Sequence, residues 1–379
     1  MKKICIFLTF SKELDNYLNI IKLFSKENII LCLSDLDKKE NSLLKKYCEN
    51  NHINYINFSQ VLKKKIQFDI LITQNFELRT FGKFSIKHFI KFILKTLLLK
   101  KKNYIKPIIK INYKKISKKT FKFPKGLDAS NFESKKISYQ NFDKIFCHSN
   151  FDKNRLKKIG FNNTYIIGFP RYNQRDLESE NFVIDEFNIK SNEKVLFWLP
   201  SRLDRATNKD SNILLWVKLL GKIAKQYKFI CRPHPDLVSN NLIKTLKKNN
   251  FLVDTNRNRK LIEIYHSASH IFCDYGETIF SSLFFEKKVI LLNYHKNIAS
   301  RFTNKNLLDI SIRDCIPNFD IENKNTYEKI KNLILTNDSW KHVFDNRKIF
   351  LKEVFPEKKQ DYYNEFFVDM INKELNNDK

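Results

Sequence analysis

The sequence predicts an α/β protein of two domains, each built around a parallel sheet. With 379 residues, the chain is too long for one typical hydrophobic core and fits two domains of ordinary size. Short apolar runs alternate with segments of helical spacing in both halves, and this alternation is typical of parallel strands joined by crossover helices. Only 6 Gly and 8 Pro are present, which argues against a fibrous or low-complexity chain.

The first domain is expected to span residues 1–176. No glycine-rich dinucleotide fingerprint follows its first apolar run, and the chain contains no P-loop, so a Rossmann oxidoreductase and a P-loop kinase are both disfavoured. Its predicted strands are Ile4–Thr9, Ile29–Ser34, Ile53–Ile56, Asp69–Thr73, Ile108–Asn112, Lys144–His148 and Tyr165–Arg171.

A basic stretch interrupts this domain, because residues 81–125 contain no acidic side chain. Within it, Lys83, Lys87, Lys91 and Lys95 recur at steps of four, along one side of a helix whose other side is apolar. Such a helix either lies on an anionic membrane surface or presents a solvated basic face over an ordinary core. The net charge of +29 predicts an acidic partner. We expect an anionic membrane and no nucleic acid, because the aromatic residues sit at core spacing and no RNP-like motif accompanies them.

Residues 177–191 are polar and are expected to link the first domain to a second at 192–343. The second domain has predicted strands at Val195–Ser201, Phe229–Pro235, His270–Glu277 and Val289–Asn293, with a helix at Thr278–Phe285. The last segment, 344–379, has only helical signals and is expected to pack back across both domains.

The strands of the second domain end in polar residues, namely Ser201, Arg232, His234 and Asp274. Ligands of open parallel sheets bind beyond the carboxyl ends of the strands, so these residues are expected to share one crevice. A helix that begins just after Gly276 directs free N–H groups and its positive dipole end there. The expected ligand is therefore an anion, most simply a phosphate.

Several roles in this crevice follow from residue type. His234, held between two prolines, is the expected catalytic residue, since an imidazole can donate to a phosphate oxygen or protonate a leaving group. Arg232 either pairs with a phosphate or forms a structural ion pair. Asp274 is expected to cap the helix, and Glu277 to accept from a substrate hydroxyl. The remaining candidates for donor binding are Gly276, Thr278, Ser281 and Ser282, of which at least one serine is expected to be an ordinary helix residue.

No metal and no cofactor are expected. The histidines are mostly isolated, and the Asp35-Leu-Asp37 segment is interpreted as a loop. The 7 Cys are odd in number and scattered, and are interpreted as reduced core residues. The apolar run Ile4–Leu8 is too short for a signal peptide, and no uncharged run approaches the ~18 residues of a membrane span. The expected location is cytoplasmic, peripheral on the inner face of the cell membrane.

Three segments in order carry a family resemblance: Gly168–Arg171, Arg232–Pro235, and Asp274-Tyr275 followed by Phe280. Together they resemble the bacterial CDP-glycerol glycerophosphotransferases, which build teichoic-acid-like and capsular polyol phosphates on a GT-B scaffold. The resemblance implies two Rossmann-like lobes with a cleft between them, the first facing acceptor and membrane and the second binding the nucleotide donor. It further implies a CDP-polyol donor, a polysaccharide or lipid-linked acceptor, release of CMP, and a secondary role for Arg171.

The chain departs from the family at three places, one of which is that the Arg expected two residues beyond Pro-Ser/Thr is out of register at Arg202. Family members carry a first-lobe His-Gly whose His is thought to be the general base, whereas the best-placed segment here is Ile111–Lys114, which makes Tyr113 a secondary candidate. The family's Ser-Ser after Asp-Tyr is replaced by Gly276-Glu277. Two alternatives therefore stay open: a GT-B glycosyltransferase that uses a CMP- or UDP-sugar, and a non-catalytic, basic, membrane-associated binding protein.

Overall fold

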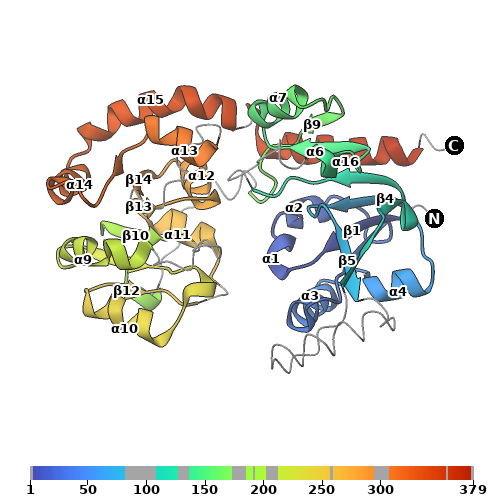
Figure 1. Cartoon of the computed structure of the whole chain (residues 1–379), viewed down its shortest axis with the longest axis horizontal. Coiled ribbons are helices and arrows are strands. Elements are labelled where there is room, and N and C mark those ends of the chain that lie inside the picture. Colours follow the sequence, from blue (N-terminus) through green and yellow to red (C-terminus); the bar gives the residue numbers. More distant parts are fainter. Residues whose placement is uncertain are drawn as a thin grey trace, which may run out of the picture. The chain divides into compact units, whose positions relative to one another are not determined.

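The computed structural model describes residues 3–81, 108–126, 136–172, 185–190, 193–201, 212–256, 259–293, 307–355 and 357–376. Two compact units are present (Figure 1). Unit 1 comprises Met1–Lys125, Phe132–Asn173 and Pro356–Lys379, and unit 2 comprises Gln174–Phe355 with the short segment Gly126–Asn131. The C-terminal helices are thus divided: α15 (Asp338–Val354) belongs to unit 2 and α16 (Gln360–Asn376) to unit 1.

Unit 1 is built on a seven-stranded parallel sheet in the order β3-β2-β1-β4-β7-β8-β9. The chain builds outward in one direction from β1 and then in the other from β4, which makes the sheet doubly wound. Its strands are β1 (Ile4–Leu8), β2 (Ile29–Leu33), β3 (Tyr55–Asn57), β4 (Phe68–Thr73), β7 (Ser117–Lys122), β8 (Lys144–Cys147) and β9 (Thr164–Ile166).

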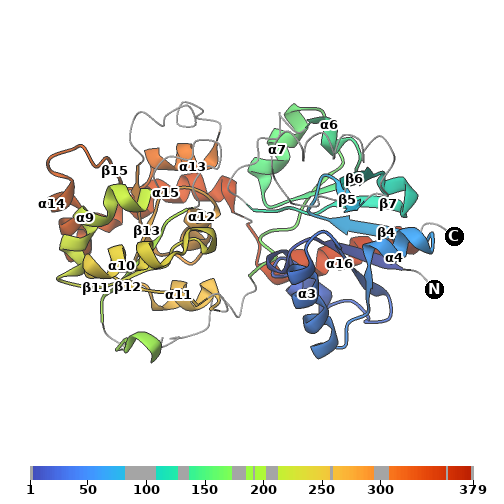
Figure 2. The same cartoon turned by 60° about the horizontal axis from the view of Figure 1, so that its bottom comes forward.

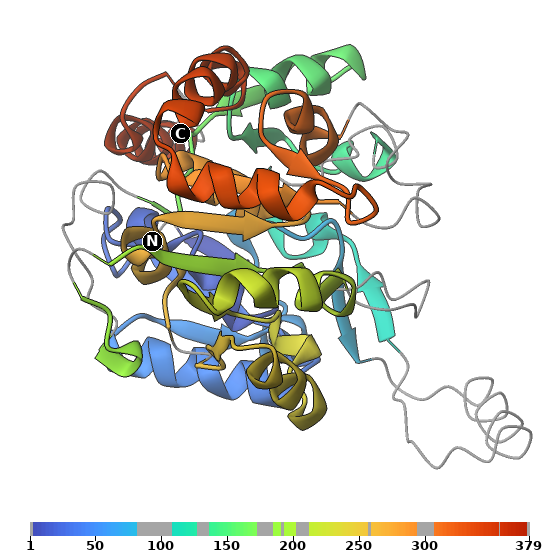
Figure 3. The ribbon, with the colours of Figure 1, turned by 90° about the vertical axis from the view of Figure 1, so that its left-hand side faces the viewer.

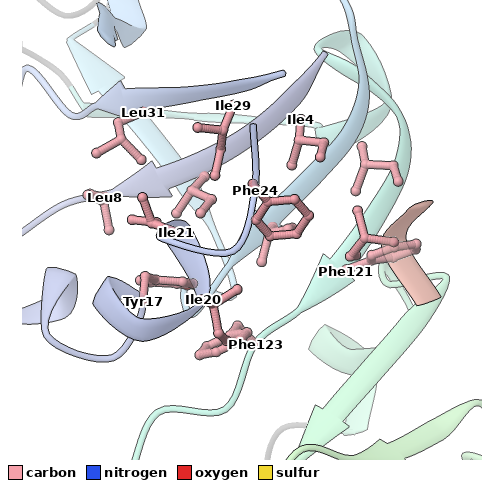
Figure 4. Close-up of a cluster of buried hydrophobic side chains, with 14 of the residues drawn as sticks. Ile4, Leu8, Tyr17, Ile20, Ile21, Phe24, Ile29, Leu31, Phe121 and Phe123 are labelled. Carbon is pink, nitrogen blue, oxygen red and sulfur yellow. The ribbon is translucent and has the colours of Figure 1, made fainter. Parts of the chain in front are cut away.

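The helices of unit 1 pack on its sheet and complete the apolar core. Tyr17, Ile20 and Phe24 pack over one face of the sheet (Figure 4). On the same face, the Phe367 ring of α16 lies 5.5 Å from Phe123 and 6.5 Å from Phe24, so the C-terminal helix completes this core. The helical segments are α1 (Ser11–Leu14), α2 (Leu18–Ile21), α3 (Lys38–Asn50), α4 (Phe58–Lys63), η1 (Tyr113–Lys115), α6 (Lys136–Tyr139), α7 (Asn150–Lys158) and α16.

The basic stretch contains two strands that differ from the prediction. Ile108–Asn112 was expected in the main sheet, but β6 (Ile108–Ile111) pairs antiparallel with β5 (Leu78–Phe81) in a separate two-stranded sheet. The strand that enters the main sheet instead is β7, which the sequence analysis did not predict. Its lysines have intramolecular partners: Lys118 pairs with Asp69 at 2.8 Å and Lys119 with Glu374 at 3.1 Å.

The four lysines expected to face a membrane, Lys83, Lys87, Lys91 and Lys95, lie outside the described residues. Within the part of the chain that is described, no helix is both long enough and apolar enough to cross a membrane.

Unit 2 repeats the architecture with a six-stranded parallel sheet in the order β12-β11-β10-β13-β14-β15. The direction of winding reverses between β10 and β13, which therefore flank the topological switch point. The strands are β10 (Val195–Leu199), β11 (Lys228–Cys231), β12 (Leu252–Val253), β13 (His270–Cys273), β14 (Lys288–Leu292) and β15 (Asn318–Phe319).

Helices cover both faces of this sheet. Trp198 of β10 and Trp216 of α9 are fully buried in the core on one face, where α9 and α14 lie side by side (Figure 3). The other face carries α11 and α12 (Figure 2). The helical segments are η3 (Asp185–Phe187), α9 (Asn212–Ala224), η4 (Pro235–Leu237), α10 (Asn240–Lys248), α11 (Leu261–Ser267), α12 (Glu277–Phe284), α13 (Leu308–Ser311), η6 (Ile312–Asp314), α14 (Thr326–Leu335) and α15.

All seven cysteines are free thiols, and only Cys315 has appreciable exposure. The placement of the other six agrees with their interpretation as core residues.

Candidate functional site

The carboxyl ends of β10 and β13 form the centre of the candidate site in unit 2. These strands pair directly, with Leu199 opposite Cys273, so the residues that follow them emerge side by side. The backbone N–H of Ser201 donates to Oδ1 of Asp274 over 2.6 Å and ties the two strand ends together. Because this is the switch point of the sheet, it is the position where ligands of doubly wound folds bind.

Asp274 holds this edge of the sheet together. Its carboxylate is completely buried and accepts hydrogen bonds from the N–H groups of Ser201 and Tyr275, the latter at 2.9 Å, and from Nδ2 of Asn212 at 3.4 Å. Burial raises the pKa of Asp274, and these hydrogen bonds to the charged form oppose the rise. The expectation that Asp274 caps the following helix is not met, because the N-cap position is Gly276.

Gly276 shapes the start of α12. Its φ of 92° and ψ of −169° lie in a region that is essentially restricted to glycine. A Cβ at this position would meet no atom within 4 Å, so the requirement for glycine comes from the backbone angle alone. The N-cap residue Gly276 has no side chain with which to cap α12, so the first turn of the helix is a suitable place for an anion.

Arg313 fixes the loop that leads into α12, and the sequence analysis missed it. Its Nε donates to Oδ1 of Asn293 at 2.9 Å, and its two terminal nitrogens donate to the carbonyl oxygens of Asp309 and Asp274. The guanidinium lies 4.0 Å from the centre of the Tyr275 ring. Burial lowers the pKa of Arg313. No motif surrounds Arg313, which follows Asp274 by 39 residues, so only the fold reveals the contact.

The two serines of α12 have different environments. Ser282 donates to the carbonyl of Thr278 at 2.7 Å, a bond within the helix that makes it an ordinary helix residue. Ser281 is 1% exposed, and its hydroxyl has no hydrogen-bond partner among the described residues. Glu277 and Thr278, in the first turn, are half-buried.

Of the two roles considered for Arg232, the structure shows the structural ion pair. Its guanidinium pairs with Asp254 at 3.4 Å and donates to the carbonyl of Arg259 at 2.9 Å. Asp254 is completely buried and also binds Nε of Arg259 at 2.9 Å, so one carboxylate joins two arginines. Burial lowers the pKa of Arg232. Asp254 and Arg259 were not predicted, although a carboxylate directly after the short apolar pair Leu252–Val253 is a usable signal.

His234 follows β11, the neighbour of β10, and its side chain is half-buried. Its carbonyl accepts the N–H of Leu237 at 2.8 Å, which starts η4. Ser201, Arg232, His234 and Asp274 therefore follow three adjacent strands at the same edge of one sheet.

The secondary candidates lie in unit 1. The Tyr113 hydroxyl is buried and donates to the carbonyl of Asn75 at 2.8 Å, and burial raises its pKa. Arg171 lies beyond β9, where its carbonyl and that of Pro170 accept from Nδ2 of Asn19 at 3.4 and 3.2 Å.

No group of three His, Cys, Asp or Glu side chains is arranged to hold a metal ion in the ranges that the structure describes. The expectation that none is needed stays a prediction.

Comparisons with known proteins place this arrangement in context. The sequence model described as CDP-Glycerol:Poly(glycerophosphate) glycerophosphotransferase matches residues 107–356. No curated protein matches the chain significantly.

Several solved structures are similar in fold. The wall teichoic acid polymerase TagF is 12% identical, with a TM-score of 0.61 over 99% of this chain and 89% of that one. MnaA of S. aureus, in a structure with UDP, is 12% identical, with a TM-score of 0.59 over 99% and 97% of the two chains. The UDP-GlcNAc 2-epimerase of Neisseria meningitidis, bound to UDP-GlcNAc, is 13% identical, with a TM-score of 0.59 over 98% and 100%. These similarities confirm the predicted fold class, two Rossmann-like units of the GT-B type.

Proposed function

Because this chain belongs to the CDP-glycerol:poly(glycerophosphate) glycerophosphotransferase family, we propose that it transfers a glycerol-phosphate-type group from a CDP-activated donor. The acceptor is a cell-surface polysaccharide or a teichoic-acid-like polymer, and the product released is CMP. Family membership makes the chain a glycerophosphotransferase-like transferase and sets aside the alternative of a non-catalytic binding protein.

The observation that carries the proposal is the N-terminus of α12, which begins at Gly276 at the switch point of the unit 2 sheet. The loop before it is fixed by hydrogen bonds of Asp274 and Arg313. A rigid turn of backbone N–H groups at a helix N-terminus suits a diphosphate, and its geometry needs no rearrangement when charge develops on the leaving group. Solved structures of TagF include one soaked with CDPG, which supports a nucleotide donor of this type.

The chain's residues then take the following roles. The first turn of α12, with Thr278 and the Ser281 hydroxyl, receives the phosphates, and the Ser201 N–H stays engaged with Asp274 to keep the loop in place. His234 donates to a phosphate oxygen or protonates the departing CMP. We propose that no divalent metal is needed, because helix dipole and side chains supply the positive potential.

A second donor class has a specific observation in its favour. Two of the similar structures are described with UDP or UDP-GlcNAc, so a UDP-sugar, or a CMP-sugar, is the alternative donor in a GT-B glycosyltransferase reaction. Isothermal titration with CMP, CDP, CDP-glycerol and UDP in the presence of EDTA separates the two. We expect CDP-glycerol to bind more tightly than UDP. Tighter UDP binding would favour the alternative, and binding that disappears with EDTA would refute the metal-free mechanism.

The role of His234 is tested against a matched histidine of the same unit. His266, on α11, is also half-buried, and its ring packs edge-on against Phe285 at 5.5 Å. We expect His234→Ala to lower kcat of CMP release by at least about 100-fold, and His266→Ala to leave it within about twofold. Equal activity of the two variants would remove His234 from the mechanism.

We also propose peripheral binding to an anionic membrane through Lys83, Lys87, Lys91 and Lys95, on sequence grounds alone. Each lysine contributes about 1 kcal/mol near an anionic surface, and salt screens the attraction. Co-sedimentation with vesicles should therefore require anionic lipid and fall as salt rises. Equal binding to neutral vesicles, or no effect of changing the four lysines to Glu, would contradict this.

A further inference from the structure

Arg313 lies beside the start of α12, where the proposed function puts the phosphates. It follows α13, which lies next to α12 (Figure 1 and Figure 2). Its guanidinium donates to the carbonyl of Asp274 and lies 4.0 Å from the centre of the Tyr275 ring, and these two residues lead directly into Gly276. Its Nε donates at 2.9 Å to Asn293, the residue after β14. The guanidinium therefore joins the carboxyl ends of β13 and β14.

The charge of Arg313 is not neutralised by a paired carboxylate. Nε and the two terminal nitrogens donate to the side-chain oxygen of Asn293 and to the carbonyl oxygens of Asp309 and Asp274, all of which are neutral. Burial lowers the pKa of Arg313, and the carboxylates of Asp309 and Asp274 oppose this shift without forming an ion pair in the described part of the chain. A guanidinium stays protonated at pH 7, and each terminal nitrogen has a second N–H group. Arg313 therefore retains a positive charge and hydrogen-bond donors for a ligand.

The two arginines near the end of β11 differ from Arg313 in this respect. Arg232 and Arg259 share the carboxylate of Asp254, which is completely buried. Arg259 also pairs with Glu263 at 3.5 Å. Their charges are therefore compensated inside the fold, and a phosphate would have to compete with these carboxylates.

A second observation at the same strand ends indicates a polar ligand. Nδ2 of Asn212 donates to the carboxylate of Asp274 at 3.4 Å and to the carbonyl of Leu292 at 3.3 Å, which fixes the orientation of the amide. Its Oδ1 then has no hydrogen-bond partner among the described residues, although Asn212 is only 2% exposed. The buried hydroxyl of Ser281 in α12 also has none within those residues. Because native proteins pair nearly all of their buried polar atoms, these groups indicate that a polar ligand completes the site.

We propose that Arg313 binds the diphosphate of the nucleotide donor at the N-terminus of α12. The inference rests on the proposed function and names a cationic side chain for its phosphate site. A guanidinium offers N–H groups in a planar fork that matches phosphate oxygens. The bonds to Asn293 and Asp274 hold this fork in place before the ligand arrives, so little side-chain entropy is lost on binding. A UDP-sugar carries the same diphosphate and would be bound in the same way.

Two substitutions separate the charge of Arg313 from its anchoring of the loop. Arg313→Gln removes the charge, and Arg313→Lys keeps the charge but loses the fork. With inorganic pyrophosphate and CDP as probes in isothermal titration, we expect Arg313→Gln to raise both Kd values at least about tenfold. Arg313→Lys should raise them clearly less, because its ammonium group still attracts the phosphates. Higher salt should reduce the difference between the wild type and Arg313→Gln, since salt screens a charge but does not restore a lost anchor.

Arg347 of α15 provides a matched control. Its guanidinium donates to the carbonyl of Lys287 at 2.9 Å and lies 3.9 Å from the centre of the Phe344 ring, so it makes the same two kinds of contact as Arg313. Lys287 directly precedes β14, which places Arg347 at the amino edge of the sheet. Arg347→Gln should therefore leave both Kd values nearly unchanged, although it also removes a buried arginine.

The outcomes distinguish this inference from the proposed function. The inference is wrong if Arg313→Gln keeps the wild-type Kd for pyrophosphate, or if Arg313→Lys loses as much affinity as Arg313→Gln. If the wild-type chain binds pyrophosphate through Arg313 but binds neither CDP nor UDP and transfers nothing, the proposed function is wrong and the inference stands. A wild-type chain that binds neither pyrophosphate nor CDP refutes the inference.

An NMR measurement decides the case in which Arg313→Gln does not fold. The ¹⁵N signal of Arg313 Nε is identified by its absence from the spectrum of Arg313→Lys, which keeps the charge of the side chain. A saturable shift of this signal on addition of pyrophosphate supports the site. The absence of a shift refutes it.

Discussion

Replacing Gly276 with Ala tests the idea that a backbone angle creates the phosphate site. The added methyl group meets no atom within 4 Å, so the whole cost comes from the φ of 92°. A non-glycine residue in this region costs about 1–3 kcal/mol. For a unit of this size, each 1 kcal/mol lowers Tm by about 2–4 °C, so a fall of about 2–12 °C is expected for unit 2.

The functional effect should be separable from this loss of stability. If the chain relieves the strain by rotating the peptide between Gly276 and Glu277, the first N–H groups of α12 turn away from the ligand. We expect the Kd for CDP, measured by isothermal titration, to rise at least tenfold, which corresponds to about 1.4 kcal/mol.

A matched glycine provides the control. Gly160, just after α7 in unit 1, has a φ of 99°, and a Cβ there would also meet nothing within 4 Å. Gly160→Ala should lower stability by a comparable amount and leave CDP binding unchanged. If Gly276→Ala bound CDP with wild-type affinity at temperatures where it is folded, the assignment of the α12 N-terminus as the phosphate site would be refuted.

Three further predictions concern single side chains. Asp274→Asn removes a charged acceptor and places an amide donor opposite that of Asn212. The free energy of unfolding of unit 2, measured in urea, should therefore fall by about 1–3 kcal/mol, and CDP should bind more weakly. Unchanged stability would refute the positioning role of Asp274. Burial lowers the pKa of His270 from 6.5 to about 3, so the neutral ring stabilises the fold above pH 6.5, and this contribution disappears as the pH falls toward 3. His270→Asn should therefore make Tm depend less on pH in this range. An unchanged dependence of Tm on pH would contradict the reasoning. In Gly168→Ala, a residue with a φ of 67° gains a methyl group that overlaps the side chain of Gln360. This variant should therefore lower the Tm of unit 1 more than Gly160→Ala does. An equal or smaller fall in Tm would contradict the packing argument.

The sequence predicts the strands well where an apolar run is not interrupted by lysines. Val195–Ser201 and His270–Glu277 contain β10 and β13, and the helical signal of residues 344–379 corresponds to the second half of α15 and to α16. It failed at β7, where three lysines in a six-residue strand conceal the alternation. Lysines are acceptable there because the fold supplies partners for each ammonium group, and the partners Asp69, Glu374 and the Gln74 carbonyl are distant in sequence.

The candidate site was predicted to a similar extent. Residues that directly follow strands, such as Ser201 and Asp274, were identified because parallel strands end at a common edge. Arg313 and Asp254 were missed, since their importance comes from long-range contacts. The role of Arg232 could not be decided from sequence, because the same guanidinium serves a phosphate or a carboxylate depending on what faces it.

The placement of α16 in unit 1 has a consequence for biosynthesis. Unit 2 is nearly continuous in sequence and can fold while the chain is still being translated, whereas the core of unit 1 lacks the Phe367 ring until α16 has left the ribosome. Until then Phe24, Phe123 and Phe146 lack their common aromatic neighbour. The first residues to be synthesised are therefore among the last to reach their final packing.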